Sequence, residues 1–194
     1  CSQSRGLGDV YKRQIISLLI LLSFSSSHTY SSEHFWKPAK DGDKIILIRH
    51  ALAPGGGDPE GFNIKDCRTQ RNLNEIGINQ SKKIGKLFEE KKIKIDQVLS
   101  SQWCRCKDTA KFAFGKFKEF SALNSTFSPP FDKNEKKQIK ELKSFIKNWD
   151  GQGKNLVLVT HYVVILAMTG EAPRSGELII TDKNFNVLST INTF

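Results

Sequence analysis

The chain has 194 residues and a formal net charge of +10 at pH 7, and this length suits one domain with a sizeable core once the amino terminus is set aside. The excess positive charge lies mostly in lysines over 82–94 and 133–147, which read as solvated helix faces without the interleaved aromatic residues typical of nucleic-acid binding. We therefore expect no nucleic-acid partner, whereas a basic surface favours anionic substrates and contact with anionic envelope lipids.

The amino terminus has the composition of an export signal. Tyr11-Lys12-Arg13 carries positive charge, residues 15–24 form an apolar stretch, and residues 25–32 are mostly small and polar. The apolar stretch is shorter than the roughly twenty residues that span a membrane, so we expect cleavage within 25–32, with a retained membrane anchor as the alternative. We predict a non-native leader and signal peptide over 1–32 and one domain over 33–194, in an exported, periplasmic protein.

Strands and helices alternate along the rest of the chain. In order, we predict a strand over 44–48, a helix over 74–92, a strand over 95–99, a helix over 103–114, a strand over 118–123, a helix over 134–149, a strand over 155–160, a helix over 163–169 and a hairpin of 177–181 with 185–188. Apolar strands that alternate with helices form sheets covered on both faces. We therefore expect a three-layer α/β/α domain with a mostly parallel central sheet and an antiparallel edge.

Basic side chains follow three of the predicted strands. Arg49 and His50 end the first strand, His161 ends the strand over 155–160, and Arg105 opens the helix after the strand over 95–99. Ligands of open α/β sheets collect beyond the carboxyl ends of the strands, so we expect these four residues to meet there. Two guanidinium groups and two imidazoles around one point form a site for a phosphoryl group, because arginine offers a planar fork of donors.

At these residues the sequence resembles the histidine phosphatase superfamily, which includes the cofactor-dependent phosphoglycerate mutases. Arg49-His50-Ala51 resembles the family's Arg-His-Gly signature, and the segment from Ser100 to Ala110 resembles its Ser-Ser-Pro-x-x-Arg-x-x-x-Thr-Ala motif. The segment from Leu73 to Gln80 resembles the Leu-Thr-x-x-Gly-x-x-Gln that opens the family's first helix, and Val159-Thr160-His161 resembles its second-histidine strand. The resemblance implies a phosphoglycerate mutase-like fold from about Lys44 onward.

The resemblance also implies a phosphatase that hydrolyses a phosphomonoester or a phosphohistidine in two steps. His50 takes the phosphoryl group as a covalent phosphohistidine, which water then releases, while Arg49, Arg105 and His161 hold its three equatorial oxygens. This chemistry requires no metal and no cofactor. Mutase activity is less favoured, because the chain is short and lacks the expected acid. The alternative is a catalytically silent domain that binds a phosphorylated ligand in the same pocket.

The general acid that protonates the leaving group is the main departure from the family pattern. The segment after the third predicted strand, where many members carry a Glu, has no carboxylate, and Tyr162 stands where other members carry an Asp. The candidates elsewhere are Asp58 and Glu60 in a glycine-rich loop, Asp66, and Glu177. A site without a strong acid suits a good leaving group, such as phosphohistidine or an acyl phosphate.

Substrate specificity is expected in the loop over 52–72 and in the segment after Asn124. Arg68 and Arg71 are candidates to reach the substrate from that loop, although both are equally well explained as surface arginines. Asn124 is the candidate from the second segment.

Apart from Cys1, the chain has three cysteines, Cys67, Cys104 and Cys106. In an oxidising compartment, a disulfide from Cys67 to either Cys104 or Cys106 would join the loop over 52–72 to the helix that carries Arg105. Closing a loop of roughly forty residues stabilises a protein by about 3 to 4 kcal/mol in the chain-entropy model. Three free thiols are the alternative.

Overall fold

The computed structural model describes residues 27–194, so most of the predicted leader lies outside the described residues. A helix that the sequence pattern did not predict, α2 (Ser27–Asp41), comes first and runs across the predicted domain start at 33. From Trp36 onward the chain forms one compact unit, and Trp36 itself is buried in its core. Between residues 27 and 194, no helix is both long enough and apolar enough to span a membrane.

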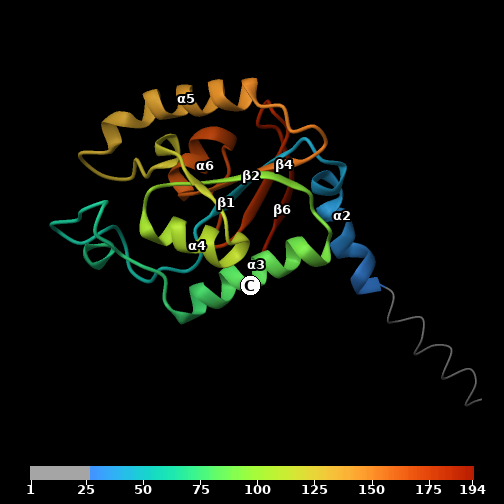
Figure 1. Ribbon diagram of the computed structural model, residues 1–194, viewed down its shortest axis with the longest axis horizontal. Helices are drawn as coiled ribbons and strands as arrows, with labels where there is room; N and C mark the ends of the chain where they lie inside the picture. Colours follow the sequence, from blue (N-terminus) through green and yellow to red (C-terminus); the bar gives the residue numbers. More distant parts are fainter. Residues whose placement is uncertain (1–26) are drawn as a thin grey trace, which may run out of the picture. The chain divides into compact units, whose positions relative to one another are not determined.

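Six strands form one sheet in the order β3-β2-β4-β1-β5-β6. Figure 1 labels β1, β2, β4 and β6 of this sheet. Strands β1 to β4 are parallel to one another, whereas β5 pairs antiparallel with β1, and β6 pairs antiparallel with β5. The predicted mostly parallel sheet with an antiparallel edge is therefore confirmed. The strands are β1 (Ile45–Arg49), β2 (Ile95–Ser100), β3 (Lys118–Glu119), β4 (Asn155–Thr160), β5 (Leu178–Thr181) and β6 (Val187–Ile191).

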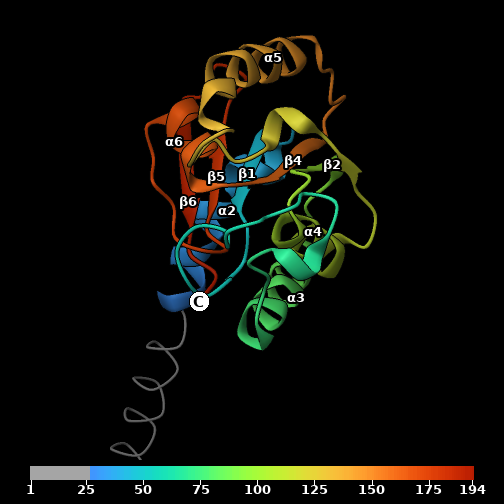
Figure 2. The same ribbon diagram turned by 90° about the vertical axis from the view of Figure 1, so that its left-hand side faces the viewer.

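Helices cover both faces of this sheet. Figure 2 shows α5 on one side of the strands and α3 and α4 on the other. The helices are α3 (Glu75–Glu90), α4 (Cys104–Phe114), α5 (Glu135–Asn148) and α6 (Tyr162–Thr169), with short 3-10 turns η1 (Cys67–Thr69), η2 (Ser121–Leu123) and η3 (Asp132–Asn134). These bounds lie within a few residues of the predicted helices, and the three-layer arrangement is confirmed.

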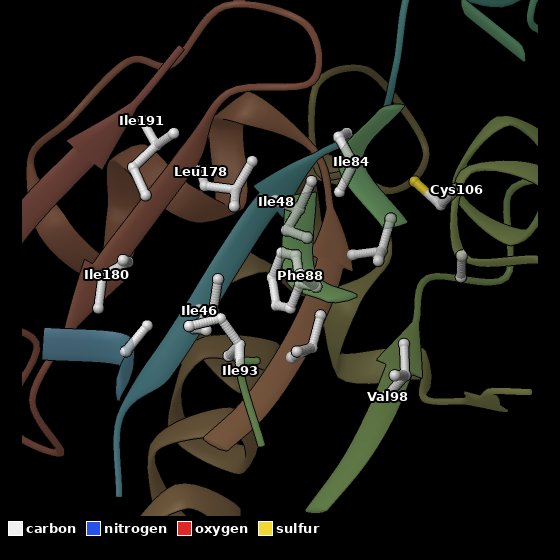
Figure 3. Packing of buried hydrophobic residues seen from close by; sticks show 14 of the residues in the cluster. Ile46, Ile48, Ile84, Phe88, Ile93, Val98, Cys106, Leu178, Ile180 and Ile191 are labelled. Carbon is white, nitrogen blue, oxygen red and sulfur yellow. The ribbon is translucent and has the colours of Figure 1, made fainter. Parts of the chain in front are cut away.

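Alternate residues of β1 enter two separate hydrophobic clusters, because successive side chains of a strand point to opposite faces. Ile46 and Ile48 pack with residues of α3 and α4, and Figure 3 shows them in one cluster with Phe88 of α3. Ile45 and Leu47 pack in the other cluster, with residues of α5 and α6. The strand is thus buried on both faces, which holds its carboxyl end in a fixed position.

Two predicted strands differ from the structure. The strand expected over 118–123 ends at Glu119, because the chain turns into η2, where Ala122 and Leu123 are both buried in the cluster beside α5. Two neighbouring side chains can enter the same face from a tight turn but not from a strand. The last strand runs to Ile191 rather than ending at 188.

Helix α3 approaches the loop after β1 so closely that position 77 has no room for a side chain. The Asn74 side chain caps the helix by accepting a hydrogen bond from the Gly77 N–H (2.9 Å), and a Cβ at Gly77 would overlap the carbonyl oxygen of Leu52. One turn later, the Gln80 carboxamide accepts from the Leu52 N–H (3.0 Å) and donates to the Ser175 carbonyl (2.8 Å). The segment from Leu73 to Gln80 therefore fixes the backbone that follows His50.

Gly77→Ala should lower the free energy of unfolding by about 1 to 3 kcal/mol, because the added methyl group displaces backbone rather than a flexible side chain. Urea denaturation measures the change. Gly56→Ala is the matched control, since its Cβ would meet no atom within 4 Å. An equal loss of unfolding free energy in the two variants would contradict the close approach of Gly77 to the Leu52 carbonyl.

Candidate active site

Arg49, His50, Arg105 and His161 line one cavity of about 520 Å³. The parallel pairing of β1 with β4 brings the two histidines together: Arg49 pairs with Thr160, and the His50 N–H donates to the Thr160 carbonyl (2.9 Å). The two imidazole ring centres lie 5.5 Å apart. Both imidazoles and the Arg105 side chain are almost completely buried. The structure thus brings together the four residues predicted to form the site.

The backbone fixes the tautomer of His50. Its Nδ1 lies 2.8 Å from the carbonyl oxygen of Ala51, which can only accept a hydrogen bond, so Nδ1 carries the proton and Nε2 keeps a free lone pair. Burial lowers the pKa of His50 well below its usual 6.5, and the positive charges of Arg105 and Arg49 lower it further. His50 is therefore a neutral imidazole at neutral pH, with Nε2 available as a nucleophile.

His161 takes the opposite tautomer. Its Nδ1 lies 3.5 Å from a guanidinium nitrogen of Arg105, which can only donate, so Nε2 carries the proton and donates to the Ser101 hydroxyl (2.9 Å). Burial lowers the pKa of His161 well below 6.5, and the positive charge of Arg105 is the second largest cause of this shift. The Cys106 sulfur lies 3.5 Å from the same Nε2, and burial raises the pKa of this thiol to about 12, so it stays protonated.

Arg105 is paired with Asp58 from the glycine-rich loop. Two oxygen–nitrogen contacts, 2.6 and 3.2 Å long, join the carboxylate to the guanidinium, and the Trp103 indole N–H donates to the same carboxylate (2.9 Å). Partial burial raises the pKa of Asp58, but the hydrogen bonds and charge of Arg105 outweigh it, and the net pKa lies below the usual value. The ionised carboxylate thus occupies the fork of donors that a phosphoryl group would use.

Arg71 holds the glycine-rich loop in place. Its side chain donates to the carbonyl oxygens of Gly57 (2.8 Å) and Ala53, and its backbone N–H donates to Asp58 (3.3 Å). Arg71 lines the cavity, and its contact with a substrate stays a prediction. Its main contacts are with the loop, so it also places the Asp58 carboxylate beside Arg105.

Two buried donors of the site have no acceptor among the described residues, the Nε–H groups of Arg49 and Arg105. Arg49 is otherwise held by a hydrogen bond to the Pro173 carbonyl (2.9 Å) and by contact with the Tyr162 ring, 5.4 Å from its guanidinium carbon. A buried N–H without a partner costs about 1 to 3 kcal/mol. Within 27–194, no group of three or more His, Cys, Asp or Glu side chains could hold a metal ion.

Four of the candidates from the sequence, Asp66, Arg68, Asn124 and Glu177, lie away from the cavity lining. Arg68 is exposed and pairs with Asp66 (2.7 Å), so this arginine and this carboxylate are engaged with each other outside the cavity. Glu177 accepts a hydrogen bond from the Arg174 N–H (2.6 Å) and does not line the cavity either. Of the four candidate acids, only Asp58 and Glu60 line it.

Asn124 contacts residues that support the site and does not contact the cavity. Its side-chain oxygen accepts hydrogen bonds from the Gln102 N–H (2.9 Å) and the Ser101 hydroxyl (3.2 Å). Asn124 thus holds the segment that leads into α4. Through Ser101 it also helps to orient His161.

Thr109 connects the backbone next to His50 with the helix that carries Arg105, a role that the sequence analysis did not predict. Its hydroxyl accepts a hydrogen bond from the Ala51 N–H (2.9 Å) and donates to the Arg105 carbonyl (2.7 Å). The backbone after His50 is thereby tied to the helix that carries Arg105. The signal in the sequence was the Thr four residues after the Arg, within the segment from Ser100 to Ala110.

The disulfide joins Cys67 to Cys104, with 5.7 Å between the Cα atoms, and Cys106 remains a free, buried thiol. This is one of the two pairings expected from the sequence. Beside the disulfide, the Cys104 N–H donates to the Gln70 side chain (2.9 Å). The loop over 52–72 is therefore attached to the start of α4, next to Arg105, by a covalent bond and a hydrogen bond.

The model of the histidine phosphatase superfamily (branch 1) matches residues 45–126, a range that contains His50 and Arg105. The resemblance to this superfamily is confirmed. The match and the fold support phosphatase activity in general. No curated protein matches the sequence.

Several solved histidine phosphatase structures share this fold. The protein histidine phosphatase SixA complexed with tungstate matches with a TM-score of 0.54 and 14% identity, over 77% of this chain and 97% of that one. A putative phosphohistidine phosphatase SixA from Agrobacterium tumefaciens matches with a TM-score of 0.54 and 19% identity, over 77% and 98%. A phosphoserine phosphatase mutant from Entamoeba histolytica, in complex with phosphoserine, matches with a TM-score of 0.54 and 17% identity, over 77% of this chain and 97% of that one. At such identities the likeness shows the fold.

The neutral histidines predict a pH-dependent stability. The pKa of His50 and of His161 is lowered in the folded protein, so the unfolded chain, with pKa values near 6.5, binds more protons below that pH. The contribution of these histidines to the free energy of unfolding should level off about one pH unit above 6.5 and fall between pH 6.5 and 5, by up to about 1.4 kcal/mol per pH unit for each histidine. Chemical denaturation at a series of pH values measures this slope.

The variants His50→Gln and His161→Gln should each reduce the slope, because each removes one proton-binding group of the unfolded chain. His34→Gln is the control, since His34 is exposed on α2. An unchanged slope in the two site variants would contradict the neutral state assigned to these imidazoles.

Proposed function

We propose that this protein hydrolyses a phosphomonoester or a phosphohistidine through a covalent phosphohistidine on His50. The observation that carries the proposal is the hydrogen bond from His50 Nδ1–H to the Ala51 carbonyl, which leaves Nε2 with a free lone pair in a residue that lines one cavity with Arg49, Arg71 and Arg105. A neutral imidazole held in one tautomer is ready to attack phosphorus without first losing a proton.

In the first step, His50 Nε2 forms a bond to phosphorus as the bond to the leaving group breaks. In the second, water attacks the phosphohistidine, the P–N bond breaks, and inorganic phosphate leaves. Arg49 and Arg105 hold the equatorial oxygens in both steps and offset their charge, which is the main source of catalysis in phosphoryl transfer. His161 joins them once the phosphoryl charge raises its pKa and Nδ1, which has no proton in the free site, gains one to donate.

His50→Gln should lower the turnover of p-nitrophenyl phosphate in the presence of EDTA by at least about a hundredfold, because glutamine offers no nucleophilic nitrogen. Release of p-nitrophenolate measures the rate. His34→Gln, at an exposed position on α2, should keep the full rate. A folded wild-type protein that binds vanadate and turns over no ester would instead favour the alternative, a catalytically silent domain that binds a phosphorylated ligand.

We also propose Asp58 as the general acid. A phosphoryl group that binds Arg105 must displace the Asp58 carboxylate from the guanidinium, which removes the contact that lowers its pKa. The nearby phosphoryl charge then raises the pKa further, because a like charge disfavours ionisation. Substrate binding would thus prepare Asp58 to hold a proton and give it to the leaving group.

Asp58→Asn should lower kcat for an alkyl phosphate such as 2-hydroxyethyl phosphate by about a hundredfold, and for p-nitrophenyl phosphate much less, since p-nitrophenolate leaves without a proton. Steady-state kinetics on both substrates measures the contrast. Glu60→Gln is the control, because it removes a carboxylate from the same cavity lining. An equal loss of kcat on both substrates in Asp58→Asn would rule out the acid role.

The protein is further proposed to be exported to the periplasm, with an uncleaved membrane anchor as the alternative. The Cys67–Cys104 disulfide supports this location, because disulfides persist in oxidising compartments. The predicted signal itself lies almost entirely outside the described residues.

A further inference from the structure

The cavity that holds His50 continues beyond the phosphoryl-binding groups into an aromatic region. Its volume of about 520 Å³ is in the range of sites that bind whole small molecules, so a phosphoryl group fills only part of it. The remaining part is lined by polar side chains that include Glu60, Ser125 and Ser128, and by a group of aromatic and proline side chains: Pro59, Phe62, Trp103, Phe127, Pro129, Pro130, Phe131 and Tyr162.

One aromatic wall of the cavity begins at His161. The Trp103 ring meets His161 edge to face at 5.4 Å, and Phe62 stacks on Trp103 at 5.2 Å. Phe131 closes the group with edge-to-face contacts to Trp103 (5.0 Å) and Phe62 (5.7 Å). These rings are already packed on one another, so this wall gives the cavity a rigid apolar side.

The second wall begins at Arg49 and ends at the rim. Tyr162 packs its ring against the Arg49 guanidinium, and Phe127 meets Tyr162 at 5.9 Å with an angle of 60° between the rings. Phe127 is 55% exposed, although it is a large apolar side chain at the edge of the cavity. An exposed aromatic side chain that continues a binding site is suited to contact an apolar part of the ligand.

We propose that the phosphorylated compound bound here carries an aromatic ring within one or two bonds of its phosphoryl group, and that Phe127 and Tyr162 bind this ring. The inference rests on the proposed function, since the phosphoryl group is placed at His50. Polar sugar or polyol groups would lose water against the faces of the Phe127 and Tyr162 rings without gaining hydrogen bonds from them, whereas an aromatic ring gains contact with both side chains. Tyr162 and Phe127 are therefore specificity-determining residues.

The test compares two phosphonates that cannot be hydrolysed, benzylphosphonate and methylphosphonate, by titration calorimetry. They share the anionic group and differ in the ring, so the ratio of their Kd values isolates the aromatic contact. The wild-type protein should bind benzylphosphonate about tenfold more tightly. Phe127→Ala should remove most of this difference and leave the Kd of methylphosphonate unchanged. Phe112→Ala is the control, because Phe112 is exposed on α4 outside this cavity.

Equal Kd values for the two phosphonates in the wild-type protein would overturn the inference, as would a preference for benzylphosphonate that persists in Phe127→Ala. Cyclohexylmethylphosphonate, which is apolar but not aromatic, should bind more weakly than benzylphosphonate, and equal binding would contradict the aromatic assignment. Turnover of p-nitrophenyl phosphate by the same samples tests the phosphatase separately. Turnover without ring preference overturns only this inference, and the absence of both turnover and phosphonate binding overturns the proposed function with it.

Discussion

The guanidinium groups of Arg49 and Arg105 and two imidazoles line one cavity, and the rest of the site depends on how their charges are made compatible. Burial keeps both histidines neutral, so that the arginines carry the positive charge of the group. The Asp58 carboxylate, on the loop over 52–72, offsets the positive charge of Arg105. The site is thus balanced by an internal carboxylate that a phosphoryl group can replace with the same fork geometry.

The scaffold holds this charged group by connecting distant segments directly to one another. The β1–β4 pairing sets the two histidines side by side, and the Thr109 hydroxyl joins the backbone after His50 to the helix that carries Arg105. The Cys67–Cys104 disulfide attaches the loop over 52–72 to the same helix. Preorganisation of this kind matters for phosphoryl transfer, where placing charge correctly does most of the catalysis.

The same arrangement divides recognition between two parts of one cavity. The buried basic groups offer a small number of directional donors, which suit a phosphoryl group and carry no information about the rest of the substrate. The aromatic walls beyond them give specificity through shape and stacking. Tyr162 belongs to both parts, because it supports Arg49 and extends the apolar surface toward Phe127.

The sequence by itself determined the sheet class and the four central residues. Apolar strands that alternate with helices leave few possible topologies, and Arg49, His50 and His161 come directly at strand ends, where the local pattern already places them at one edge. Only the tertiary structure decided the partner of Arg105, the choice between the cysteines, and the positions of Arg68 and Glu177 outside the cavity. These features depend on loops whose conformation is set by contacts between residues far apart in the chain, such as those of Arg71 and Gln80, and no local periodicity records such contacts.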